Sequence, residues 1–294
     1  YAKSENGSAK GGAIWTNKSL NLIADGKHVE IRDNYTESNG VKDDNAIYLD
    51  AADATLTLNL KNNGSLYLKD NIDGVAGSTT DITGDGTGIL YLHNDIRTDV
   101  TMGNVTLNTI NDATEALNMK SLTLTGDVDM AVDVDLANAQ MDRLTAKEYG
   151  QHTGNINVVG FNLLSDATTN DTSILFAENG LKDNVKLAAT SAPTADYQLT
   201  AYTPIYKYNV SYDNSGDNGY FLFQKPVVNS GGSGSATPAP SYQAFNPAVL
   251  GGSTSASVGA VGTINQTMNH AFGNVDTFMD IPYLERVAMK NRNK

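Results

Sequence analysis

The sequence repeats itself in two stretches, Ser65-Leu-Tyr-Leu-Lys-Asp-Asn-Ile72 and Ile89-Leu-Tyr-Leu-His-Asn-Asp-Ile96. Their matching residues keep a constant offset of 24 positions, as between Leu66 and Leu90. Apolar residues alternate within each stretch, and alternate residues of a β-strand point to the same face. Each stretch is too short to form a stable sheet alone, and its Asn and Asp residues favour a turn. The repeat therefore predicts short strands that recur once per coil of the chain.

Similar alternations lie on both sides of the repeat. They are Ile47-Tyr-Leu49, Leu56-Thr-Leu-Asn-Leu60, Val105-Thr-Leu107, Leu122-Thr-Leu124 and Val132-Asp-Val-Asp-Leu136. Short strands that recur about every 20 residues favour a solenoid, in which each coil buries its apolar face against the next. We expect an all-β fold, a right-handed parallel β-helix over residues 1–201. A sandwich with hairpin connections is the alternative that the pattern leaves open.

The composition narrows the possible partners and the possible cellular context of the chain. The 294 residues include 33 acidic and 20 basic ones, and the net charge is −13. This balance disfavours nucleic acid as a partner, because phosphate binding needs a clustered cationic face. The chain has no cysteine, which suits a protein that crosses membranes without forming disulfides. No apolar run approaches the roughly 20 residues of a transmembrane helix.

Four carboxylates share one face of a predicted strand in the segment Asp127-Val-Asp-Met-Ala-Val-Asp-Val-Asp-Leu136. They are Asp127, Asp129, Asp133 and Asp135. Such a row is a weak candidate for Ca²⁺, which takes several oxygen ligands. Because no glycine-punctuated calcium loop accompanies the row, we expect a solvated face whose charge discourages aggregation. No metal site and no cofactor is predicted.

Residues 202–226 predict a β-hairpin. Tyrosines alternate before the turn Asp213-Asn-Ser-Gly-Asp-Asn-Gly219, and Tyr220-Phe-Leu-Phe223 returns after it. We expect the hairpin to cover the open end of the solenoid, where a coil would otherwise expose its core. The residues expected to make this cap are Tyr206, Tyr208, Phe221 and Phe223. A tyrosine stripe that stacks against sugar rings is the alternative.

The composition changes after the hairpin. Residues 227–258 are rich in Gly, Ser, Ala, Thr and Pro, which predicts a flexible linker. Residues 259–294 form a predicted α-helical segment with a narrow apolar stripe. The stripe includes Ile264, Met268, Phe272, Val275 and Met279. A lone helix is marginal in water, so this segment is expected to have a partner.

No catalytic constellation stands out. The histidines His28, His93, His152 and His270 are scattered and lack metal-ligand spacing. There is no Gly-x-Ser-x-Gly elbow, and the aspartates are too plentiful to single out a pair for glycoside cleavage. We therefore expect a protein that is not an enzyme. A polysaccharide-acting β-helix enzyme is one alternative, and three or more Asp, Lys or Arg side chains meeting in one groove would favour it.

The order of these segments resembles the C-terminal part of a bacterial autotransporter (type Va secretion) passenger. Gly11-Gly-Ala-Ile-Trp15 is similar to the recurring coil motif of that family. Asp133-Val-Asp-Leu followed by Met141-Asp-Arg-Leu-Thr-Ala146 is similar to its last coils. Phe245-Asn-Pro247, the stripe ending at Asn274-Val-Asp-Thr-Phe-Met279 and Arg286-Val-Ala-Met-Lys290 resemble the linker that precedes the membrane barrel.

The resemblance implies an extracellular, cell-surface or released passenger that a barrel anchors in the outer membrane in the full-length protein. It also implies that the Ile264 to Met279 helix threads the pore of that barrel, which is absent from this sequence. The expected function is adhesin-like and non-catalytic, in which an elongated acidic surface contacts a host surface or other copies of the chain. A phage tail-spike-like fibre is a further alternative, although it would not explain the linker and helix.

Overall fold

The computed structural model describes residues 2–5, 9–188, 199–203 and 206–225. The predicted linker and α-helical segment, with Ile264, Met268, Phe272, Val275 and Met279, lie outside the described residues. The described residues other than Tyr206 and Lys207 belong to one compact unit, Tyr1–Thr203 with Tyr208–Lys225. The fold of this unit is all-β apart from a short 3-10 helix, η1 (Lys182–Asn184). Within the described residues, no helix is long and apolar enough to cross a membrane.

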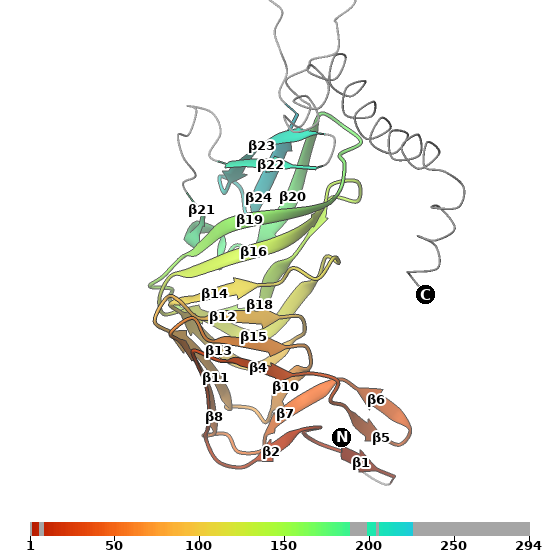
Figure 1. Ribbon diagram of the computed structural model, residues 1–294, viewed down its shortest axis with the longest axis vertical. Coiled ribbons are helices and arrows are strands. Elements are labelled where there is room, and N and C mark those ends of the chain that lie inside the picture. The colour runs from red at the N-terminus through yellow and green to blue at the C-terminus, as the bar shows by residue number, and fades with distance from the viewer. Residues whose placement is uncertain (1, 6–8, 189–198, 204–205, 226–294) are drawn as a thin grey trace, which may run out of the picture. The chain divides into compact units, whose positions relative to one another are not determined.

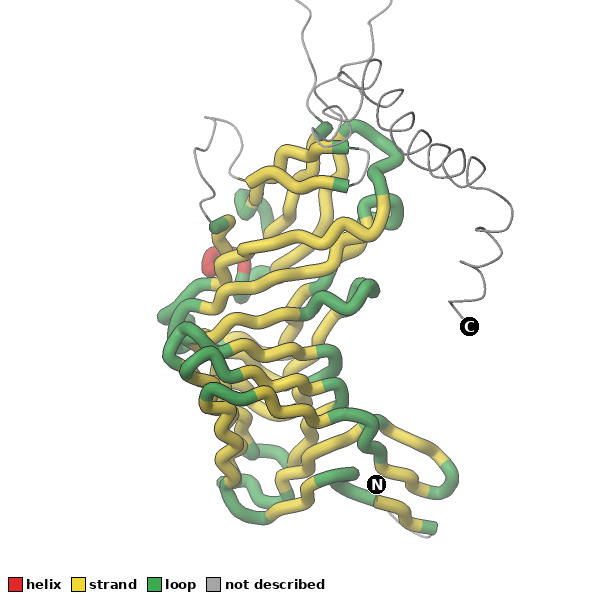
Figure 2. Tube along the Cα trace, viewed as in Figure 1, coloured by secondary structure: helices red, strands yellow, loops and turns green. Residues whose placement is uncertain are grey.

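Two sheets of mainly parallel strands form most of the unit (Figure 1). Sheet I has nine strands: β2 (Ile14–Thr16), β3 (Leu20–Asp25), β7 (Asn45–Leu49), β8 (Thr55–Lys61), β10 (Asn71–Gly74), β11 (Thr79–Gly84), β13 (Ile96–Gly103), β15 (Ala116–Leu124) and β18 (Arg143–Tyr149). Sheet II has eight: β4 (His28–Ile31), β9 (Ser65–Leu68), β12 (Ile89–Leu92), β14 (Val105–Asn108), β16 (Val128–Asp135), β17 (Gln140–Met141), β19 (Ile156–Ser165) and β21 (Val185–Leu187). The strands of successive coils stack above one another, and loops make the corners between them (Figure 2).

The sequence repeat sets the register of the coils. Strand β9 pairs with β12 in parallel, and the paired residues include Leu66 with Leu90 and Tyr67 with Tyr91. Ile72 pairs with Ile96 on the next side of the coil. The offset of 24 residues is therefore one coil, and the predicted parallel solenoid is confirmed in place of the sandwich alternative.

Apolar side chains form continuous columns inside the coils. One column in sheet II runs through Val29, Leu66, Leu90, Leu107, Met130, Val158 and Leu187. Leu90, Leu107, Met130 and Val158 are fully buried. A parallel column in sheet I runs through Leu22, Leu58, Ile82, Met102 and Leu124. Each residue covers its counterpart one coil away, so the core grows by one layer per coil.

Glycines let the corners of successive coils approach closely. A Cβ at Gly64 would lie 2.0 Å from the carbonyl oxygen of Ala24, and a Cβ at Gly88 would lie 2.5 Å from Cβ of Leu60. Real Cβ atoms do not approach so near, so these two corners require glycine.

An antiparallel hairpin interrupts the first coils. Strands β5 (Thr36–Ser38) and β6 (Val41–Asp43) pair antiparallel, and β1 (Ala2–Ser4) pairs with β5. Asn39 and Gly40, with φ of 52° and 81°, make the turn. Asn-Gly favours this hairpin turn because both residues tolerate positive φ. The prediction that all of the first residues form coils was wrong at this point.

A four-stranded sheet, sheet III, adjoins the last coils. Its order is β20 (Asp171–Ala177), β24 (Gly219–Gln224), β23 (Lys207–Asp213) and β22 (Leu199–Tyr202). The predicted hairpin strands are β23 and β24, which pair antiparallel. Strand β20 also pairs antiparallel with β24 instead of adding to sheet I. Parallel pairing among the described strands therefore ends at β18 in sheet I and at β21 in sheet II, before residue 201, where the coils were predicted to end. In sheet I it ends there because β20 pairs with β24 and not with β18.

Candidate functional site

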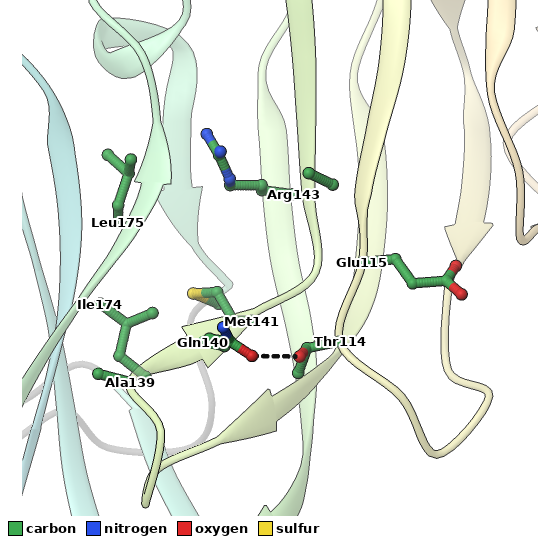
Figure 3. A pocket seen from close by; sticks show the side chains of 9 residues that line it. Thr114, Glu115, Ala139, Gln140, Met141, Arg143, Ile174 and Leu175 are labelled. Atoms are coloured by element: carbon green, nitrogen blue, oxygen red, sulfur yellow. Dashed lines mark hydrogen bonds between the residues drawn. The ribbon is translucent and has the colours of Figure 1, made fainter.

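A pocket lies where sheet I ends and sheet III begins. It has a volume of about 330 Å³, which is at the lower end of the range of ligand sites. Its polar lining residues are Thr114, Glu115, Gln140 and Arg143, and its apolar ones are Ala116, Ala139, Met141, Ile174 and Leu175. They come from the loop after β14 and the start of β15, from β17 and its preceding turn, from the start of β18 and from β20 (Figure 3).

The change in strand pairing creates this pocket. Among the described strands, β18 pairs only with β15, while β20 pairs only with β24. One backbone amide of β18 bonds to a side chain and not to a neighbouring strand. The Tyr149 hydroxyl accepts a 3.1 Å hydrogen bond from the Ala146 amide and donates a 3.2 Å bond to Glu178. Burial raises the pKa of Tyr149 to about 12, so its hydroxyl keeps the proton that it donates.

Arg143 is the cation of the pocket. Its Nη1 lies 3.4 Å from Oε1 of Glu178, and this contact is the only hydrogen bond or ion pair found for its side chain among the described residues. The Thr114 hydroxyl donates a 3.4 Å hydrogen bond to Oε1 of Gln140 across the pocket. Figure 3 shows the Glu115 carboxylate directed away from Arg143. The pocket therefore offers a guanidinium, an amide and a hydroxyl beside an apolar wall.

Two fully buried carboxylates, Asp133 and Asp142, hold the loop that carries Thr114 and Glu115. Asp133 accepts hydrogen bonds from the amides of Asn111 (2.7 Å) and Ala113 (3.3 Å). Asp142 accepts them from the Glu115 amide (2.8 Å), the Thr109 hydroxyl (2.6 Å) and the Asp133 amide (2.8 Å). Burial raises the pKa of Asp142 to about 6 and outweighs these three hydrogen bonds, which favour the charged form.

The predicted carboxylate row is only partly a solvated face. Its apolar partners point inward as predicted, and Asp127 and Asp129 are exposed. Asp135 is half-buried and bonds to Ser165, whereas Asp133 is fully buried beneath the loop that follows β14. The expectation of a solvated position was therefore wrong for Asp133, because a distant loop covers it. In the part of the chain that the structure describes, no group of three or more His, Asp or Glu side chains could hold a metal ion.

The predicted hairpin residues are buried on sheet III. Tyr208, Phe221 and Phe223 are fully buried, while Tyr206 is half-buried just before β23. Phe161 of β19 lies edge-on to Phe221 and Phe223, each with a centroid distance of 5.3 Å. The side chains that contact the coils therefore include Phe221 and Phe223.

The outward face of sheet I carries small polar side chains in register. We call these residues the polar face: Thr55, Thr57, Thr79, Asp81, Asp99, Thr101, Ser121 and Thr123, from strands β8, β11, β13 and β15. Neighbours on adjacent strands bond to each other, as the Thr55 and Thr79 hydroxyls do at 2.9 Å and the Ser121 hydroxyl and Asp99 do at 2.8 Å. The polar face is thus a ladder of short side chains held in place by one another.

Three carboxylates meet one cation beside the β5–β6 hairpin. Arg97 lies 3.1 Å from Asp43, 3.4 Å from Asp73 and 3.8 Å from Asp95. Burial raises the pKa of Asp73, although the charge of Arg97 opposes this shift. Because Arg97 and Asp43 are exposed, these ion pairs stabilise the fold little.

No local pattern in the sequence marks Thr114, Gln140, Arg143 or Asp142 as site residues. Asp142 and Arg143 belong to the segment that resembles a coil motif, and nothing in that segment indicates that they lie at a pocket. No protein-family model, no curated protein and no solved structure matches this chain.

Proposed function

We propose that this chain is the C-terminal part of an autotransporter passenger, a non-catalytic, adhesin-like surface domain whose polar face associates with other copies of the chain. The single observation that supports this function most is the polar face itself. Hydroxyl groups both donate and accept hydrogen bonds, so two copies of such a face can complement each other about a two-fold axis.

The chemistry of the polar face favours association over simple solvation. Its threonines are β-branched and stiff, so they lose little rotamer freedom on contact. Only Asp81 and Asp99 carry charge, and the Lys120 ammonium lies 2.6 Å from Asp99. Repulsion between two such faces is therefore small, despite the net charge of −13.

The finer architecture belongs to the same proposal. The coils are right-handed, as nearly all parallel crossovers are, and the β23–β24 hairpin caps the last coil through Phe221 and Phe223. Residues 227–258 are the linker, and the helix with Ile264 to Met279 lies in the pore of an outer-membrane barrel. The proposal places the coils outside the cell, and it expects the reading frame to continue past Lys294 into barrel strands of about ten residues.

Sedimentation velocity over a range of protein concentrations tests the self-association. We expect concentration-dependent dimers or larger species for the native chain, and loss of association when Thr57→Lys and Thr101→Lys place like charges across the face. Thr106→Lys is the matched control, because Thr106 faces outward on sheet II. A native chain that stays monomeric throughout, or a control that abolishes association equally, would contradict the proposal.

A further inference from the structure

We propose that the pocket between β18 and β20 binds the carboxylate group of a small ligand through Arg143, with the ligand's apolar body against Ile174 and Leu175. This binding site is separate from the polar face, and it does not depend on self-association.

Arg143 has unused hydrogen-bonding capacity. A guanidinium has five N–H donors in a planar fork. Arg143 makes one contact among the described residues, at the long distance of 3.4 Å to Glu178, and 27% of its side chain is exposed. The free donors of a guanidinium match the two oxygens of a carboxylate, which it binds in a bidentate manner.

The polar groups around the pocket offer hydrogen-bond donors to a ligand. The free donors at the pocket are the N–H groups of the Arg143 guanidinium and of the Gln140 amide, because the Thr114 hydroxyl already donates its proton to Oε1 of Gln140. The lining acid, Glu115, is directed away from Arg143 (Figure 3). A ligand that supplies acceptors therefore fits better than one that supplies donors.

A ligand must partly displace Glu178 from Arg143. The Tyr149 hydroxyl donates to the other oxygen of Glu178, at 3.2 Å. Glu178 therefore keeps a hydrogen-bond partner when Arg143 turns to a ligand, and the exchange leaves no carboxylate without a donor. Glu178 acts as a competitor for Arg143, and its removal should strengthen binding.

Isothermal titration with two matched probes tests the proposal. N-acetyl-L-leucine carries a carboxylate and an apolar side chain, and N-acetyl-L-leucinamide is its neutral counterpart. We expect the acid to bind about tenfold or more tightly than the amide, as a hydrogen-bonded charge pair implies. D-glucuronate and D-glucose form a second pair, which shows whether the preferred carboxylate comes from an amino-acid derivative or from a sugar acid.

Variants assign the binding to Arg143. Arg143→Gln should weaken binding of the acid by about tenfold or more, and Arg143→Lys should recover only part of it, because lysine lacks the fork. Glu178→Gln should tighten binding, which a merely structural role for this pair would not produce. Arg97→Gln is the control, because Arg97 lies among acids outside the pocket lining. A melting curve for each variant shows that it is folded.

Three results would overturn the proposal. The first is equal binding of each acid and its neutral counterpart, or no binding of either acid at concentrations up to about 10 mM, above the millimolar range of weak small ligands. The second is unchanged binding in folded Arg143→Gln. The third is weaker binding in Glu178→Gln, which also decides the matter if Arg143→Gln does not fold.

Discussion

In the stacked coils each buried side chain lies over its counterpart one coil away, whereas in sheet III the buried side chains converge on one aromatic cluster. Leu66, Leu90 and Leu107 belong to a column in which every layer resembles the next. Phe221, by contrast, contacts Phe161, Phe176 and Tyr212 with centroid distances of 5.3, 5.0 and 4.9 Å. Stability is therefore spread over many equal layers in the coils and concentrated in a few rings in sheet III.

The difference also explains where the pocket lies. Parallel coils leave little space between layers, because each strand bonds to the strands above and below it. Among the described strands, β20 of sheet III does not bond to the coil below it, because it pairs with β24. The cavity forms at that break, and side chains of the last coils and of β20 line it.

The largest expected effect is that of Phe221→Ala. Phe221 is fully buried, so its truncation should cost about 3–5 kcal/mol of unfolding free energy. Hydrogen exchange should show lost protection first in β20 and β24, and later in β9 and β12. Equal loss of protection in all four strands would mean that sheet III and the coils unfold as one unit, contrary to the difference described above.

Leu90→Ala comes next, at about 2–5 kcal/mol. Because Leu90 contacts the layers on both sides, the cost should be confined to neighbouring coils. Denaturation followed by hydrogen exchange would show whether β9, β12 and β14 lose protection together while sheet III keeps it. Loss that begins in sheet III would contradict the layered account of the coils.

Gly88→Ala tests how closely the coils pack at a corner. The new Cβ would lie 2.5 Å from Leu60, and such overpacking should cost about 1–3 kcal/mol. Gly216→Ala is the matched control in the β23–β24 turn, where the new Cβ would meet nothing within 4 Å. Urea denaturation of both variants measures the difference, and equal costs would show that the corners are not close-packed.

The smallest effect, per pH unit, concerns Asp142. Its pKa is raised from 3.8 to about 6 in the folded state, so between these values the folded protein binds more protons than the unfolded one. The protonated Asp142 side chain therefore adds its full contribution to the unfolding free energy below pH 3.8. This contribution is lost as the pH rises to about 6. The slope is at most about 1.4 kcal/mol per pH unit.

Asp142→Asn removes this titration and keeps the shape of the side chain. Denaturation at several pH values between 3.8 and about 6 measures the unfolding free energy of both proteins. The unfolding free energy of the native protein, relative to that of the variant, should fall as the pH rises. A difference that is constant with pH would show that Asp142 stays charged, because its three hydrogen bonds then outweigh burial.

Local sequence patterns predicted the coils because each coil repeats the same alternation of apolar residues. The 24-residue offset and the inward alternation of Val128 and Met130 each follow from neighbours in the sequence, and both are confirmed. The turn at 213–219 likewise predicted the antiparallel pair β23 and β24.

The remaining features depend on contacts between distant segments. Asp133 and Asp129 have the same local pattern, yet only Asp133 is covered, because the loop with Asn111 folds over it. Strand β20 has an alternation that suits either a coil or a hairpin, and its pairing with β24 decides between them. The pocket depends on that pairing, so no local pattern could indicate Arg143 as a site residue.

Cysteine cross-linking tests the parallel register of the coils most directly, because the chain has no cysteine of its own. Ser65 and Ile89 are paired neighbours on parallel strands, about 4.8 Å apart, which suits a disulfide. Thr106 lies one strand further from Ser65, about 9.6 Å away, beyond the reach of a disulfide. We predict that Ser65→Cys with Ile89→Cys forms a disulfide under mild oxidation, while Ser65→Cys with Thr106→Cys does not. A disulfide between cysteines at 65 and 96, with none between 65 and 89, would show antiparallel pairing and contradict the account.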